Sequence, residues 1–152
     1  MKEPIKIRNI LSILPLVRKW QRSRQENFLT ITLNSVHELI KVHHVTKGIV
    51  NQTIIHPREC FYPTIKDLAT SVIFVHNHPS GSAQPSKEDD KITQRLGMAA
   101  EIMGLHLLDH IIITPGIDFY SYRQAGKIPV KYKPKELSQF VASLSNRYGE
   151  EP

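Results

Sequence analysis

The chain has 152 residues, of which 40% are hydrophobic and 22% charged, a composition typical of one globular domain. The sequence contains no apolar run near the roughly 20 residues that cross a bilayer, and its first residues lack the apolar stretch of a signal peptide. We therefore expect a cytoplasmic protein without a membrane segment. One cysteine, Cys60, excludes a disulfide framework and a zinc site built on several thiolates, so any metal must be bound by His, Asp or Glu.

The first 25 residues mix basic and apolar side chains, and we expect an amphipathic helix there that Pro15 interrupts. The whole chain has 20 Lys and Arg against 14 Asp and Glu, a net charge of +6. This excess is shared between the two ends of the chain. Any contact with nucleic acid is therefore expected to be weak and non-specific.

The next segment predicts a β-hairpin. Apolar residues alternate with threonine from Phe28 to Leu33, and a turn at Asn34 precedes a second β-prone run through Val45. Residues 49–55 are expected to extend the sheet. Residues 57–68 begin with proline and suit a short helix.

The central part of the chain alternates strand and helix. The run from Ser71 to Val75 is apolar on both faces, as a central strand is, and a Pro/Ser/Gly loop separates it from a helix over Lys87 to Met103. The apolar stripe of this helix comprises Ile92, Leu96, Ala99 and Met103, and Gly104 ends it. Two strands, His106 to Thr114 and Phe119 to Tyr122, precede a basic, weakly helical tail. These elements favour an α/β or α+β fold with a mixed sheet flanked by helices.

Two histidines at the end of the central strand indicate a metal site. His76 and His78 are two residues apart, so both imidazoles project to the same side of the sheet. A third ligand is expected from the first turn of the following helix, where helical periodicity directs Asp90 away. Periodicity does not separate Asp89 from Glu88, and either carboxylate suits the chemistry. Two imidazoles and one carboxylate leave a fourth position on Zn²⁺ for a water of lowered pKa, which is typical of a hydrolytic site.

The same residues resemble a known family. The segment from His76 to Asp89 fits the JAMM (MPN+) metalloprotease pattern H-x-H-x7-S-x2-D, and the stretches HPREC, HNHPSG, PSKEDD, LLDHIII and YSYR resemble landmarks of the bacterial RadC family. The resemblance implies the JAB/MPN, cytidine-deaminase-like architecture. It also implies His76, His78 and Asp89 as zinc ligands, with Ser86 near the metal-bound water or an oxyanion. Ser86 and Asp89 equally form a helix-capping pair, worth about 1 kcal/mol.

JAMM enzymes use an upstream glutamate as general base, and here Glu26, just before the first predicted strand, occupies that place. Glu59, within HPREC, is the competitor, although pairing with Arg58 or capping of local backbone suits it better. Asp109 and His110 lie in an apolar strand, where they could orient a metal ligand or form a buried pair that supports the fold.

The resemblance implies three parts: a basic helical lead-in over residues 1–25, a RadC-like JAB/MPN domain over 26–125, and a basic, partly helical tail over 126–152. It implies a zinc-dependent hydrolase that cleaves a peptide or isopeptide bond of a peptide or protein substrate, with Glu26 as base and Ser86 stabilising the oxyanion. The alternative is a factor associated with DNA repair or nucleic acid whose metal site is structural or vestigial. The oligomeric state and the substrate are not predicted.

Overall fold

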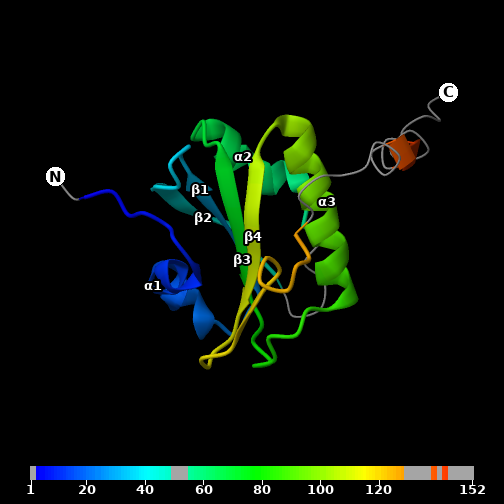
Figure 1. Cartoon of the computed structure of the whole chain (residues 1–152). Coiled ribbons are helices and arrows are strands. Elements are labelled where there is room, and N and C mark those ends of the chain that lie inside the picture. The colour runs from blue at the N-terminus through cyan, green and yellow to red at the C-terminus, as the bar shows by residue number, and fades with distance from the viewer. Residues whose placement is uncertain (1–2, 49–54, 129–137, 140–141, 144–152) are drawn as a thin grey trace.

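The computed structural model describes residues 3–48, 55–128, 138–139 and 142–143, and shows a five-stranded mixed sheet with helices on both faces (Figure 1). The strands are β1 (Asn27–Leu33), β2 (Leu39–Lys47), β3 (Ser71–Asn77), β4 (His106–Ile113) and β5 (Phe119–Ser121). Their order across the sheet is β2-β1-β3-β4-β5. This is the mixed α/β architecture that the sequence predicts.

The pairing of the strands follows from their connections. β1 and β2 form the predicted antiparallel hairpin, in which the Asn34 side chain accepts hydrogen bonds from the backbone of Val36 and Glu38. β3 pairs antiparallel with β1 and parallel with β4. Helix α3 connects β3 to β4, as parallel strands require. β3 is thus the central strand, and all of its residues are buried.

Two apolar cores cover the two faces of the sheet. Helix α1 (Ile10–Gln21) packs on one face, and helices α2 (Pro57–Lys66) and α3 (Lys87–Met103) pack on the other (Figure 1). β3 contributes to both cores by alternation: Ile73 faces α1, whereas Phe74 faces α2 and α3. Cover on both sides explains why β3 reads as a continuous apolar run.

The helix expected near the N-terminus is present, but the interruption predicted at Pro15 is wrong, because α1 continues through this residue. A proline inside a helix costs about 3 kcal/mol through one lost hydrogen bond and a clash with the preceding turn. Ile13 and Val17 flank Pro15 and are buried in the core. Burial of such side chains contributes roughly 1.5 to 3 kcal/mol each, which offsets that cost.

Helix α3 has the predicted bounds, and Gly104 ends it in the left-handed conformation with φ 68°. The predicted apolar stripe is wrong in part. The fully buried residues of α3 are Thr93, Leu96, Gly97 and Ala100. Of the other residues predicted for the stripe, Ile92 and Ala99 are partly buried and Met103 is 40% exposed. The helix is therefore rotated toward Thr93, whose hydroxyl has partners inside the protein.

Some predicted elements lie outside the described residues. These are most of the strand expected over residues 49–55 and most of the tail after residue 128. The described residues of this tail, 138–139 and 142–143, are helical. Within the described part of the chain, no helix has the length and apolar character needed to span a membrane.

Candidate metal centre

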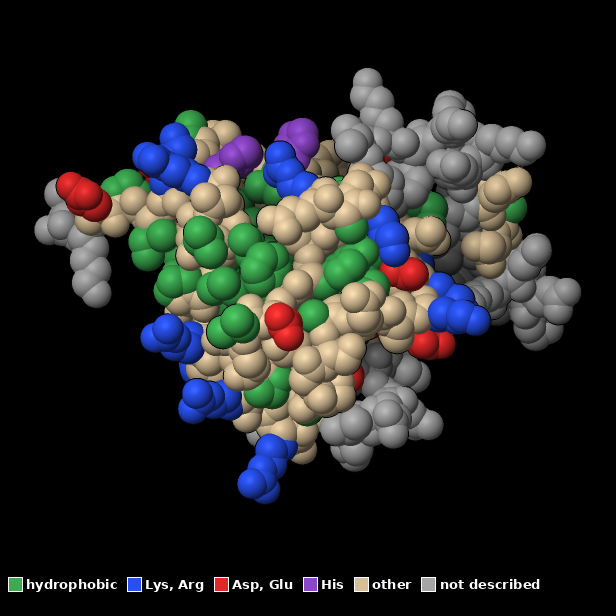
Figure 2. Space-filling view, turned by 60° about the horizontal axis from the view of Figure 1, so that its bottom comes forward, with side chains coloured by type: hydrophobic (Ala, Val, Ile, Leu, Met, Phe, Trp, Pro, Cys, Tyr) green, Lys and Arg blue, Asp and Glu red, His purple; other side chains and the backbone are tan. Residues whose placement is uncertain are grey.

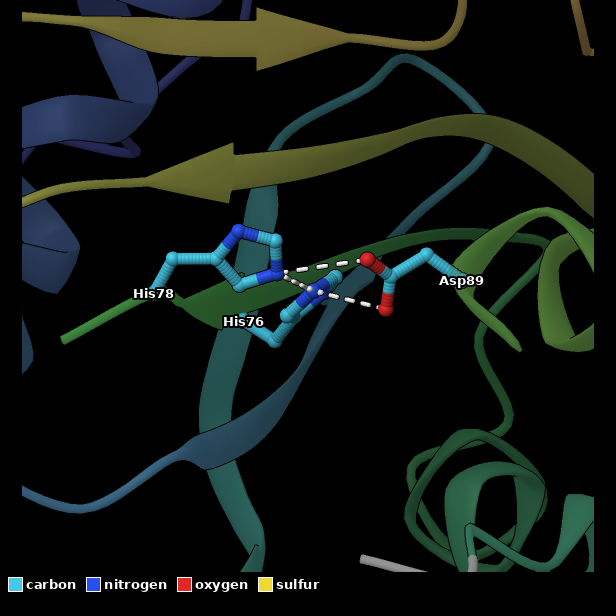
Figure 3. Close-up of side chains that lie close together, drawn as sticks. All are labelled: His76, His78 and Asp89. Carbon is cyan, nitrogen blue, oxygen red and sulfur yellow. Dashed lines mark hydrogen bonds and ion pairs between the residues drawn. The ribbon is translucent and has the colours of Figure 1, made fainter. Parts of the chain in front are cut away.

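Three side chains from two elements converge at one end of the sheet (Figure 3). His76 is the second-last residue of β3, and His78 directly follows the strand. Because the two residues are two apart, both rings point to the same side of the sheet. The loop that follows returns the chain to the first turn of α3, which carries Asp89. Glu88 is exposed and lies outside this cluster, so of the two carboxylates it is Asp89 that lies beside the histidines.

The distances between the imidazole nitrogens and the carboxylate oxygens show that these possible metal-ligand atoms lie close together. The Nε2 atoms of His76 and His78 are 2.9 Å apart. Asp89 Oδ1 lies 3.2 Å from His76 Nε2, and Asp89 Oδ2 lies 3.2 Å from His78 Nε2. One possible ligand atom from each residue lies within 4.8 Å of the others. Two imidazole nitrogens and a carboxylate oxygen form a donor set that a divalent metal ion accepts, so these residues fit such an ion.

The far nitrogen of each imidazole also has a partner inside the protein. His78 Nδ1 lies 2.9 Å from the carbonyl oxygen of Ser82. Because a carbonyl only accepts, His78 Nδ1 must donate, and in the neutral ring Nε2 keeps its lone pair. His76 Nδ1 lies 2.8 Å from His110 Nε2, and His110 Nδ1 lies 2.6 Å from the hydroxyl of Thr93.

The charges of the cluster favour an ionised carboxylate. Burial raises the pKa of Asp89, but hydrogen bonds from His76 and His78 outweigh burial, and the pKa lies well below its ordinary value. For His78, burial lowers the pKa, while the hydrogen bonds to Asp89 and Ser82 and the negative charges of Asp89 and Glu26 raise it more, so the net shift is upward. Burial lowers the pKa of His110, which is fully enclosed, and keeps this ring neutral.

Ser86 caps the helix that carries Asp89. Its hydroxyl accepts a hydrogen bond from the Asp89 backbone N–H at 3.1 Å, and Asp89 Oδ2 accepts one from the Ser86 backbone N–H at 2.8 Å. The cap uses Asp89 Oδ2, which also lies near His78 Nε2, and leaves Oδ1 to face His76, so the capping pair and the cluster coexist. The Ser86 hydroxyl hydrogen is not used by the cap.

Glu26 lies close to the cluster, although it is not one of the three converging residues. It directly precedes β1, in which Phe28 pairs with His76, and its negative charge raises the pKa of His78. Glu59 lies on α2 and forms an ion pair with Arg58 at 3.8 Å, the partner predicted for it. Of the two candidate bases, Glu26 directly precedes the strand that pairs with His76, and its charge acts on His78.

Asn77, between the two histidines, holds the segment that carries Glu26. Its side-chain oxygen accepts from the Asn27 backbone N–H at 2.7 Å, and its amide donates to the Gln25 carbonyl at 3.0 Å. The sequence pattern predicted no role for Asn77. The alternation of β3 contains the signal, because the residue between two histidines on one side of the sheet must face the other way.

Two more residues near the cluster differ from expectation. Asp90 was expected to point away, but it is partly buried and accepts a hydrogen bond from the Tyr122 hydroxyl at 2.8 Å. Thr93, to which no role was assigned, is buried beside His110. Both differences follow from β4 and the turn after β5, which pack on α3 and whose position helical periodicity does not reveal.

The buried residues of β4 have separate contacts. His110 lies against His76, whereas Asp109 accepts hydrogen bonds from the Ser121 hydroxyl and from the backbone N–H groups of His110 and Arg123. Asp109 thus ties β4 to β5 and the turn after it.

Cys60 is buried in the core, and burial raises its pKa to about 12, so it behaves as a small apolar side chain.

Comparison with known proteins identifies the family. The model of the RadC-like JAB domain family matches residues 6–127. A UPF0758 protein of Trichlorobacter lovleyi is 46% identical over 104 residues, 68% of this chain and 45% of the relative. A UPF0758 protein of Streptococcus sanguinis is 42% identical over 126 residues, 80% of this chain and 55% of the relative. The chain spans about half the length of these relatives. Because the family match extends over most of its sequence and includes the histidine and aspartate cluster, this chain belongs to the RadC-like JAB domain family.

Proposed function

We propose that this protein is a zinc-dependent hydrolase of JAMM type that cleaves an amide bond, either a peptide or an isopeptide bond. One observation carries the proposal: His76, His78 and Asp89 place two imidazole nitrogens and one carboxylate oxygen within 4.8 Å of one another. Three protein ligands of this kind, with one position left open, are typical of catalytic rather than structural zinc. When bound, zinc would supply Lewis-acid activation of water and of the scissile carbonyl.

The surrounding side chains have the chemistry for the remaining roles. Glu26, whose charge acts on His78, is proposed to accept a proton from the attacking water and to deliver it to the leaving amine. Ser86 keeps its hydroxyl hydrogen free while its oxygen accepts from the helix, and it is proposed to donate to the developing oxyanion. His78 and Asp89 are fixed by Ser82 and by the helix cap, which favours a rigid site.

The substrate is proposed to be a peptide or protein. The loop of residues 79–85 runs from β3 to α3 and is largely exposed beside the cluster. Loops held by a rigid scaffold often contact substrate, so this loop is proposed as one edge of the substrate site.

The proposal is tested by hydrolysis of a fluorogenic peptide library and of isopeptide-linked peptides, before and after chelation and with zinc restored. We expect hydrolysis to disappear with the metal, to return with zinc, and to be absent in Asp89→Asn. Hydrolysis that resists the chelator and persists in Asp89→Asn would exclude this mechanism. One zinc per chain without hydrolysis of any substrate would favour the alternative, a nucleic-acid-associated factor with a structural metal site.

A further inference from the structure

We propose that Thr93 and His110 are positioning residues that hold the proton of His76 on Nδ1 and thereby keep His76 Nε2 free to bind the metal. This inference rests on the proposed metal site. It concerns a series of hydrogen bonds that begins in α3, crosses to β4 and ends at β3. Thr93, at one end of the series, determines which atom donates in each of these hydrogen bonds.

Thr93 has one hydroxyl hydrogen, and it donates this hydrogen to the backbone carbonyl of Asp89 at 2.7 Å. The carbonyl cannot donate in return, so the Thr93 oxygen is left as an acceptor. His110 Nδ1 lies 2.6 Å from that oxygen and must supply the hydrogen. The Tyr122 hydroxyl, which lies on the same side of α3, donates to Asp90 and so does not compete as a donor.

The proton position on His110 then determines that on His76. His110 is fully buried between aromatic rings. A neutral imidazole carries one ring hydrogen, and the contact with the Thr93 oxygen places it on Nδ1. With its hydrogen on Nδ1, its Nε2 can only accept, and the donor across the 2.8 Å contact is His76 Nδ1. In the neutral His76 ring, Nε2, which faces Asp89 and His78, then keeps its lone pair.

If donors and acceptors were exchanged along this series of hydrogen bonds, metal binding would be opposed. If Thr93 donated to His110 Nδ1, His110 Nε2–H would donate to His76 Nδ1, and a neutral His76 would hold its hydrogen on Nε2. The ring of His110 is held in place by stacking on Tyr122, with centroids 5.2 Å apart and planes within 10°. Rotation of the ring is thus restricted, and the partner of Nδ1 decides between the two states.

Threonine variants test the inference through zinc affinity, measured by competition with a chelator. Thr93→Val keeps the shape but removes the hydroxyl that orients His110, the partner of His76, and we expect zinc to bind 10- to 100-fold more weakly, the loss typical of mutations in the residues that support metal ligands. Thr93→Ser should bind zinc nearly as wild type does. The matched control is Thr30→Val, because Thr30 is also buried and its hydroxyl donates to the Cys60 carbonyl away from the cluster. This control should lose stability but not zinc affinity.

A second measurement does not require metal. Nitrogen-15 NMR of the imidazoles in metal-free wild-type protein should show His110 neutral, with its hydrogen on Nδ1. A hydrogen on Nε2 of His110, or equal zinc affinities of Thr93→Val and Thr30→Val, would overturn the inference. If wild-type protein bound no zinc, the proposed function would fail, whereas the position of the His110 hydrogen would still test the series of hydrogen bonds.

Discussion

Ser86 and Asp89 satisfy each other's backbone N–H groups at the start of α3, at 3.1 and 2.8 Å, while the Asp89 carboxylate also lies 3.2 Å from each of two histidine Nε2 atoms. One carboxylate therefore caps the helix and completes the cluster. The cap restricts its rotation, so local folding of α3 positions a candidate metal ligand before any metal binds.

This double role predicts the effect of Ser86→Ala. Loss of an N-cap hydroxyl should lower the free energy of unfolding by about 1 kcal/mol, in metal-free protein as well. Zinc affinity should also fall, because Asp89 loses part of the cap that orients it. Asn9→Ala is the control, since the Asn9 side chain caps α1 by accepting from the Leu11 N–H at 3.0 Å. Urea denaturation and chelator competition should show similar stability losses but a zinc effect in Ser86→Ala alone. Equal zinc affinities would contradict this prediction.

Zinc content is the most direct prediction for the cluster. Protein purified without chelator should contain one zinc per chain by elemental analysis, and zinc should raise the melting temperature, because an ion that binds only the native state stabilises it. His78→Ala should remove both the zinc and this increase, with little effect on metal-free protein. His106→Ala, at an exposed histidine outside the cluster, is the control and should behave as wild type does. An equal loss of stability in metal-free His78→Ala would mean that His78 serves packing.

Sequence patterns predicted much of this fold because the relevant signals are local. The apolar run of β3, the bounds of α3 and its stop at Gly104 follow from periodicity and from the chemistry of helix ends. The burial of Thr93 does not, because its partner His110 lies on a strand 17 residues further along. Continuation of α1 through Pro15 depends likewise on burial against the sheet, which local propensity does not encode.

The same distinction applies to the candidate site. The spacing of His76 and His78 predicted convergence of their rings, whereas the choice of Asp89 over Glu88 required the resemblance or the structure. The contact between Asn77 and Asn27, the first residue of β1, joins residues 50 apart in the sequence, beyond the reach of any periodic pattern.

A carboxylate outside the cluster predicts a pH dependence of stability. Asp67 Oδ2 accepts from the Thr32 hydroxyl at 2.6 Å and lies 2.6 Å from His43 Nε2. Burial raises the pKa of Asp67, but the hydrogen bonds from Thr32 and His43 outweigh it, and the pKa lies below its ordinary value. The folded-state pKa is thus below the unfolded value of about 3.9, so this stabilisation is present above that value and is lost as pH falls through the folded pKa.

Asp67→Asn should therefore lower the free energy of unfolding at pH 7, and its difference from wild type should shrink as the pH falls below about 4. Asp118→Asn, at an exposed carboxylate, is the control and should change stability little at pH 7. Urea denaturation across this pH range provides the measurement. A deficit of Asp67→Asn that stays constant down to the acid limit would show that its cause is packing rather than charge.

Nucleic-acid binding, proposed as the alternative role, should be weak. The exposed basic residues of α1 and the segment after it are Arg18, Lys19, Arg22 and Arg24. On the face in Figure 2, Lys and Arg side chains are spread singly around an apolar area rather than gathered in one patch. Few phosphates could be neutralised at once, so affinity for random-sequence DNA, measured by fluorescence anisotropy, should fall steeply with salt. Tight binding to one sequence at physiological salt would reverse the order of the two proposals.

The general base is tested by a matched pair of glutamate variants. Glu26→Gln should keep zinc bound but lose most hydrolysis, because a neutral amide preserves the shape of the side chain and accepts no proton from water. Glu59→Gln should keep its activity, because Glu59 pairs with Arg58 at 3.8 Å on α2 and is not one of the three converging residues. Hydrolysis rates at saturating zinc, with zinc content measured for both variants, separate the two outcomes. If Glu59→Gln loses hydrolysis while Glu26→Gln retains it, the base is Glu59 and the role proposed for Glu26 is wrong.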